Sequence, residues 1–233
     1  MRYRRLLQCL VVWSFVIWTL VTGIDSARGA EVSECDGLGS ENMPALRVGQ
    51  IVGTDRAYFL TWMLSPECRA NSQKCRQDRQ PYVIPGDRVV VTGVVPGFVC
   101  AAYSKNGRSD VDGWLPEKQV KIEDPAKSPQ QLTRWVGEWS GQYASAWIDI
   151  GRGKGHTLHA VGHAELREGE YEGDFEGDLS VIGNTAKVND EVVGNYGCVV
   201  SLLLLGGLMA VTDNEACGGL NVRFIGWFIR QRK

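Results

Sequence analysis

Three histidines are the side chains in this sequence best suited to metal or acid–base chemistry. His156, His159 and His163 are the only histidines, and all lie within the segment GKGHTLHAVGHAEL. On a helix this spacing would place them on one face and suggest zinc. The surrounding glycine, threonine and valine residues instead favour a strand. There His156 points away from the other two, which lie about 13 Å apart. We therefore expect no metal site and no cofactor.

The segment EYEGDFEGDL alternates acidic residues with apolar residues or glycine. Successive side chains of a strand point to opposite faces, so one face would be apolar and would pack inward. The other face would be a stripe of like charges, which a nearby counter-charge would stabilise. This stripe would be a solvated surface that prevents edge pairing, a docking site for a cationic partner, or a calcium site. It comprises Glu170, Glu172, Asp174, Glu176 and Asp178.

Aromatic residues provide a second candidate surface nearer the N-terminus. Trp114, Tyr82 and Tyr103 lie in predicted strands and could line an aromatic groove. The same side chains could instead pack in a core, and both alternatives stay open from the sequence. Trp227 and Phe228 would point to opposite faces of the last strand.

Motifs typical of enzymes do not occur in this chain. There is no Gly-x-Ser-x-Gly, phosphate-binding loop, dinucleotide fingerprint or His-Glu-x-x-His. Carboxylate pairs for glycoside cleavage need a cleft and a raised pKa, and a flat strand face would offer neither. We therefore expect a non-enzymatic protein.

Six cysteines follow Cys9 in the sequence: Cys35, Cys68, Cys75, Cys100, Cys198 and Cys217. An even number behind an export signal implies disulfides, although some could stay reduced and buried. Cys68–Cys75 would close a short loop, and Cys198–Cys217 follows from the hairpin register described next. Cys35–Cys100 is left by elimination. Paired cysteines also exclude thiol catalysis, which needs a free thiolate.

The most apolar stretch after the N-terminus is Asn195–Arg230. Gly206–Gly207 separates two apolar runs and predicts a tight hairpin with positive φ at both glycines. If Leu205 faces Leu208, Cys217 becomes the diagonal neighbour of Cys198 on one face. We expect a third strand over Asn221–Arg230.

The N-terminus has the features of an export signal. Basic residues precede an uncharged run from Leu6 to Ile24, and small residues follow at Ala27 and Gly29. We expect residues 1–30 to be a cleaved signal peptide and the protein to be periplasmic or secreted, with an uncleaved anchor as the alternative. Residues 1–30 hold four arginines and one aspartate, so the remainder is more acidic than the whole chain's net charge of −2. This charge argues against nucleic-acid binding.

Short strands fill both halves of the remaining chain, so we expect an all-β protein with two small barrel-like domains. Residues 46–123 would form five or six strands, and residues 134–233 a closed antiparallel barrel of about eight. Residues 31–45 would be a loose lead-in. Residues 124–133 have prolines and charges but no apolar run, which predicts a linker between separately folding units. Within the first unit we expect one strand over Ala57–Leu64, a polar loop over Ser65–Gln80 and a turn over Gly93–Gly97.

Several motifs suggest family relationships. YVIPGDRV at 82–89, FVCAAY at 98–103 and GWLP at 113–116 resemble bacterial SH3-like domains of exported proteins over residues 45–123. That resemblance implies binding of cell-wall peptides or protein modules, or a spacing role, and no binding site is transferred. WVGEW at 135–139 resembles the Gly-x-Trp opening of calycin-type barrels. Ser140–Tyr143 is similar to part of a lysozyme-inhibitor signature, and the C-terminal end is similar to uncharacterised exported bacterial proteins.

These observations favour an exported binding protein of the bacterial envelope. It would bind a protein or a cell-wall component, as an inhibitor or adaptor for a cationic protein. The alternatives are a structural envelope protein, a carrier of a small apolar ligand, and an unrecognised hydrolase. The sequence predicts neither the partner's identity nor the oligomeric state.

Overall fold

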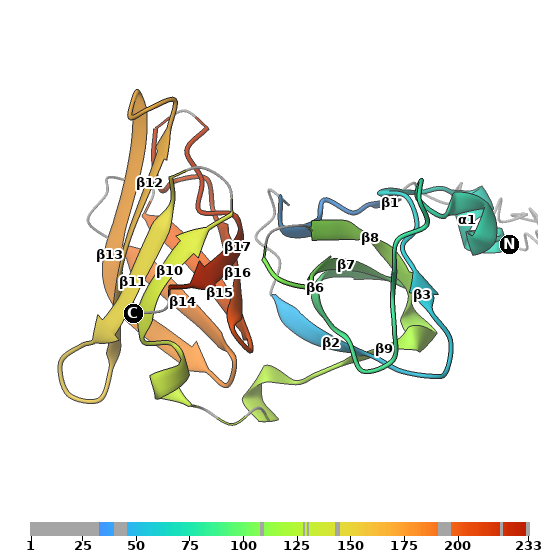
Figure 1. Cartoon of the computed structure of the whole chain (residues 1–233), viewed down its shortest axis with the longest axis horizontal. Coiled ribbons are helices and arrows are strands. Elements are labelled where there is room, and N and C mark those ends of the chain that lie inside the picture. Colours follow the sequence, from blue (N-terminus) through green and yellow to red (C-terminus); the bar gives the residue numbers. More distant parts are fainter. Residues whose placement is uncertain are drawn as a thin grey trace, which may run out of the picture.

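The structure is a computed structural model that describes residues 33–39, 46–107, 110–127, 129, 131–142, 145–190, 197–219 and 221–231. It contains two β units packed side by side, with the N-terminal unit on the right of Figure 1 and a barrel on the left. The predicted signal peptide and its apolar run lie outside the described residues. Among those described, no helix has the length and apolar character needed to cross a membrane.

The N-terminal unit is built around a five-stranded antiparallel sheet in the order β8-β7-β6-β2-β9. Two short strand pairs, β1 with β4 and β3 with β5, flank it. Its core contains Val89, Val91, Val99 and Leu115, because alternate residues of the strands point inward. The strands are β1 (Ser33–Glu34), β2 (Arg47–Ile51), β3 (Ala57–Tyr58), β4 (Met63–Leu64), β5 (Tyr82–Val83), β6 (Arg88–Val95), β7 (Phe98–Ser104), β8 (Asp110–Pro116) and β9 (Val120–Ile122).

Three local predictions in this unit were wrong. The segment 57–64 breaks into β3 and β4. The polar loop contains α1 (Pro66–Ala70), which starts at Pro66 because the Ser65 side chain accepts a bond from Cys68 N, followed by a 3₁₀ helix over Ser72–Cys75. The predicted turn at Gly93–Gly97 is shorter, because β6 continues to Val95 through a register shift between Val91 and Gly93.

The C-terminal unit is a closed barrel in which each strand pairs with the next and β10 pairs with β17. This confirms the predicted antiparallel eight-stranded barrel. It has up-and-down connectivity, which leaves no free sheet edge. The strands are β10 (Gly137–Gly141), β11 (Trp147–Arg152), β12 (Leu158–Leu166), β13 (Tyr171–Ile182), β14 (Thr185–Asp190), β15 (Cys198–Leu205), β16 (Leu208–Asp213) and β17 (Gly226–Arg230).

Aromatic side chains fill the barrel interior. Trp139, Phe175 and Phe228 are buried there, and Phe175 packs edge-on against Phe224 at 4.7 Å between ring centroids. Gly162 makes room for Phe175, since a Cβ at this position would lie 2.1 Å from the phenyl ring. Buried Trp135 packs at one end, and Cys217, Gly218 and Val222 pack against Gly173 of β13 at the other. An eight-stranded barrel has an interior that side chains alone can fill.

The three predicted disulfides are present: Cys35–Cys100, Cys68–Cys75 and Cys198–Cys217. Leu205 pairs with Leu208 as expected, and Gly206 has a φ of 66°, whereas Gly207 does not adopt a positive φ. The last strand is shorter than expected and begins at Gly226. Three disulfides indicate an oxidising, extracytoplasmic location.

An apolar interface joins the two units. The row Leu203, Ala210 and Trp227 crosses the outer face of β15–β17. It packs against Val48, Val90 and Ala102, which form a row across β2, β6 and β7, and against Leu38 of the segment preceding them. All seven are buried. The linker is therefore not the only connection between the units, and residues 33–39 are not a loose lead-in.

Candidate binding surfaces

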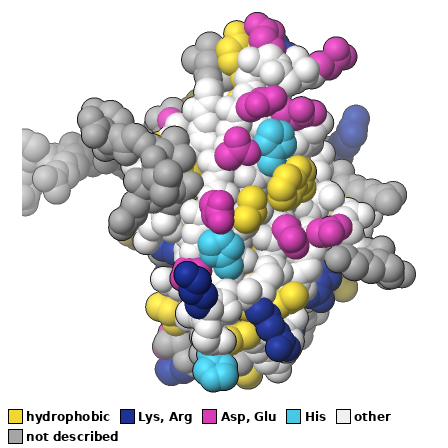
Figure 2. Space-filling model, turned by 90° about the vertical axis from the view of Figure 1, so that its left-hand side faces the viewer, with side chains coloured by type: hydrophobic (Ala, Val, Ile, Leu, Met, Phe, Trp, Pro, Cys, Tyr) yellow, Lys and Arg dark blue, Asp and Glu magenta, His cyan; other side chains and the backbone are white. Residues whose placement is uncertain are grey.

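The outer face of β11–β13 gathers acidic residues in rows fixed by the strand register. One row is Trp147, His163 and Asp174; the next is Asp149, Val161 and Glu176; a third contains His159 and Asp178; Glu165 faces Glu172 further along. We call these ten residues the outer acidic face. Figure 2 shows acidic side chains gathered on this side of the molecule with histidines and hydrophobic side chains among them. Within these three strands the one Lys or Arg is Arg152, at the end of β11.

The alternation predicted for Glu170–Leu179 is present. Glu172, Asp174, Glu176 and Asp178 are exposed, whereas Gly173 and Phe175 are buried between them. Glu170 lies before β13 and pairs with Arg167 at 3.9 Å. The acidic stripe therefore consists of the four carboxylates within the strand.

Two histidines pair with carboxylates of the stripe. His159 Nδ1 lies 2.9 Å from Asp178 Oδ1, and its Nε2 lies 3.0 Å from Glu176 Oε1. His163 Nδ1 lies 2.7 Å from Asp174 Oδ1. The bonds to Asp178 and then Glu176 raise the pKa of His159 above its ordinary value of 6.5, although desolvation acts in the opposite direction. Protonation of His159 therefore reduces the negative charge of this face.

Apolar side chains lie among these charges. Trp147 is 43% exposed and Val161 is 37% exposed. The Trp147 ring lies near the His163 ring, with centroids 6.0 Å apart and an angle of 35° between the ring planes. An exposed tryptophan surrounded by polar groups has the composition of an interface anchor with a polar rim.

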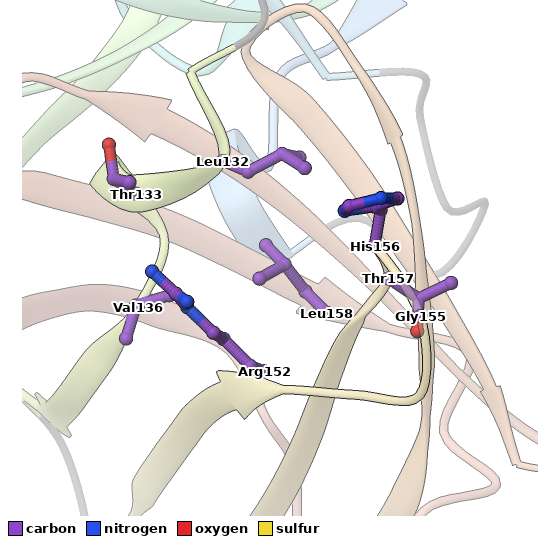
Figure 3. A pocket seen from close by; sticks show the side chains of 8 residues that line it. All are labelled: Leu132, Thr133, Val136, Arg152, Gly155, His156, Thr157 and Leu158. Atoms are coloured by element: carbon purple, nitrogen blue, oxygen red, sulfur yellow. The ribbon is translucent and has the colours of Figure 1, made fainter.

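His156 lies apart from the other histidines, at the mouth of the barrel. It lines a pocket of about 400 Å³ together with Leu132, Val136, Arg152 and Leu158. Figure 3 shows these side chains converging from the segment before β10, from the end of β11, from the start of β12 and from the loop between β11 and β12. The pocket is mainly apolar, but it lies at the barrel's end, and the interior beyond it is packed.

The predicted aromatic groove does not form from the three expected residues. Trp114 is 2% exposed, and its Nε1 donates to Trp62 O at 2.8 Å, so it belongs to the core around Cys35–Cys100. Tyr103 packs against another core, and burial followed by the charge of Asp87 raises its pKa. Only Tyr82 is exposed.

Tyr82 instead joins a stack that sequence analysis missed. Its ring lies 5.7 Å from Tyr58, its cross-strand partner. The Arg56 guanidinium lies 4.2 Å from the Tyr82 centroid, and that of Arg76 lies 3.8 Å from the Tyr58 centroid. Arg56 immediately precedes β3, and Tyr58 is the last residue of that strand. Arg76 comes from the 65–80 segment, and nothing in the local sequence indicates that it would contact Tyr58.

In the described parts of the chain, no group of three or more His, Cys, Asp or Glu side chains is arranged to hold a metal ion.

Comparison with known proteins gives no identification: no family model, curated protein or solved structure matches this chain.

Proposed function

We propose that the protein is an exported, non-enzymatic binding protein of the bacterial envelope that engages a cationic partner protein through the outer acidic face. The observation that carries this proposal is the position of exposed Trp147 and Val161 among the carboxylates of β11–β13. The two apolar side chains would supply buried contact area, and the carboxylates would pair with Lys and Arg of the partner. Such charge complementarity accelerates association and selects basic partners.

The disulfides support the exported location, because such bonds persist in oxidising compartments. The SH3-like resemblance and the five-stranded sheet of the N-terminal unit support an adaptor in which that unit provides a second binding module. Weak resemblance to lysozyme-inhibitor barrels makes lysozyme, a basic protein, the first partner to test.

The packed interior argues against the carrier alternative. Trp139, Phe175 and Phe228 occupy the volume in which a barrel of this size would hold a small ligand. The pocket near His156 lies at the end of that packed region, where Leu158 belongs to both. If the protein has a purely structural role, no binding partner is expected. If it is a hydrolase, turnover of a substrate is expected.

Binding of lysozyme to the full chain, measured by calorimetry, tests the proposal, with an acidic protein of similar size as the control ligand. We expect binding that weakens at high salt, because exposed charges are screened. Trp147→Ala and Asp174→Asn should each weaken it, whereas Glu67→Gln, on exposed α1, should not. Envelope extracts provide the same test for other basic proteins. Absence of a basic partner at low salt, or equal binding by all variants, would refute the proposal.

A further inference from the structure

A groove in the N-terminal unit concentrates positive charge in an otherwise acidic protein. It has a volume of about 720 Å³, and Arg56, Arg76 and Lys118 line it. Among the described residues that line it, Asp55 is the one carboxylate. The whole chain, by contrast, has a net charge of −2. This groove is therefore opposite in charge to the outer acidic face and lies on the other unit.

The three cations are available to a ligand. None of them makes an ion pair with a carboxylate in the part of the chain that the structure describes, unlike Arg88, which pairs with Glu123 at 2.9 Å, and Arg223, which pairs with Asp213. An arginine side chain without a carboxylate partner keeps its five N–H donors for water or a bound anion.

The stack Arg56–Tyr82–Tyr58–Arg76 holds two of these cations in place. Each guanidinium lies over one tyrosine ring, so stacking restricts its motion while its edge N–H groups stay free. A guanidinium fixed in this manner loses less conformational entropy on binding and can donate two hydrogen bonds to one carboxylate in a bidentate arrangement. The stack is thus preorganised for anions.

We propose that this groove binds an acidic polypeptide segment, with Arg56 and Arg76 each engaging a carboxylate and Lys118 adding a third positive charge. The arginines favour a peptide over a polysaccharide. A guanidinium already lies over one face of each tyrosine ring, which leaves less aromatic surface for stacking against a sugar. Carboxylates of Asp or Glu can add to the guanidinium edges without disturbing the stack. Gln73 and Gln119 line the same groove and can bond peptide backbone.

This site is independent of the proposed function, because it lies on the other unit and takes ligands of opposite charge. The test is fluorescence anisotropy of labelled hexaglutamate with the full, disulfide-bonded chain. We expect saturable, salt-sensitive binding. Arg56→Gln and Arg76→Gln should each weaken it about tenfold, as expected for loss of a charge-assisted hydrogen bond. Arg76→Lys should retain more affinity than Arg76→Gln.

Two controls separate this site from general electrostatics and from the acidic face. Lys154→Gln removes the same charge from an exposed position on the barrel and should leave the affinity unchanged, as should Trp147→Ala. Thermal unfolding of each variant checks that it is folded. Three results would overturn the proposal: no binding of hexaglutamate, equal weakening by Lys154→Gln and Arg76→Gln, or preferential binding of polygalacturonate, which would indicate an acidic polysaccharide.

Discussion

Arg223 Nε lies 2.7 Å from Oδ1 of Asp213, a carboxylate that is fully buried where β16 ends. The same carboxylate accepts bonds from the backbone N–H groups of Phe224 at 2.5 Å and Glu215 at 3.0 Å. This one side chain therefore fixes both ends of the loop that carries Cys217 and closes the barrel. The bonds also explain why β17 starts only at Gly226.

Arg223→Met should lower the free energy of unfolding by about 3–5 kcal/mol, because it leaves the Asp213 carboxylate buried without its cation. Arg167→Met is the matched control: Arg167 is exposed and lies 3.9 Å from Glu170, so its loss should cost at most about 1 kcal/mol. Urea denaturation measures both. Similar costs for the two variants would contradict the role assigned to Asp213.

The pH dependence of stability should reflect the raised pKa of His159. A raised pKa in the folded state means that the stabilisation is fully present below the unfolded value of 6.5 and is lost as the pH rises through the folded value. His159→Asn should therefore destabilise the protein more at about pH 5 than at about pH 8. Asp178→Asn should lower the pKa of His159, measured by NMR titration, more than Glu176→Gln does. The reverse order would mean that Glu176 is the main partner.

Gly162→Ala should destabilise the barrel by about 1–3 kcal/mol, because the added methyl group would collide with the Phe175 ring. Gly151→Ala on the adjacent strand is the control, since nothing lies within 4 Å of a Cβ there. Thermal unfolding followed by circular dichroism distinguishes the two. Equal stabilities would show that Phe175 can move aside.

Separation of the units should expose the apolar row Leu203, Ala210 and Trp227. A fragment of residues 133–233 should therefore self-associate and unfold at lower denaturant concentration than the intact chain. This revises the expectation that the barrel folds independently, which rested on the linker alone. Sedimentation velocity and urea denaturation provide the measurements. A monomeric fragment as stable as the barrel in the whole protein would restore the original expectation.

Loss of the Cys198–Cys217 bond should cost roughly 3 kcal/mol on chain-entropy grounds, and Cys198→Ser, Cys217→Ser and the double variant should be equally unstable. Sequence separations of 7, 19 and 65 predict that Cys68–Cys75 contributes least and Cys35–Cys100 most. Denaturation midpoints of the three double Cys→Ser variants test this order.

Local patterns in the sequence were sufficient for much of the barrel. The diglycine at 206–207 sets the register of β15 and β16, and the register brings Cys198 near Cys217. Strict alternation in β13 places its carboxylates outward. These features depend on residues close in sequence, where turn type and side-chain period decide the structure.

Several features that depend on distant residues could not be predicted. The apolar run Val199–Leu205 predicted a hairpin with one buried face. Both faces of β15 are apolar because the outer face is also buried, against the N-terminal unit. Pairing of His159 with Asp178 requires the β12–β13 register. The arginine–tyrosine stack joins β3, β5 and the segment after α1. Trp114 is a residue type that is common in binding sites, but its neighbours from distant segments bury it in a core.

The apolar interface between the units has a consequence for the two proposed binding surfaces. The outer acidic face lies on the side of the barrel turned away from the N-terminal unit, and β3, which carries Tyr58, lies toward the opposite end of the molecule. Two ligands bound together would be held on opposite sides of this packed interface. The packing of Leu203, Ala210 and Trp227 against Val48, Val90 and Ala102 gives one route, besides the linker, by which one ligand would influence the affinity for the other.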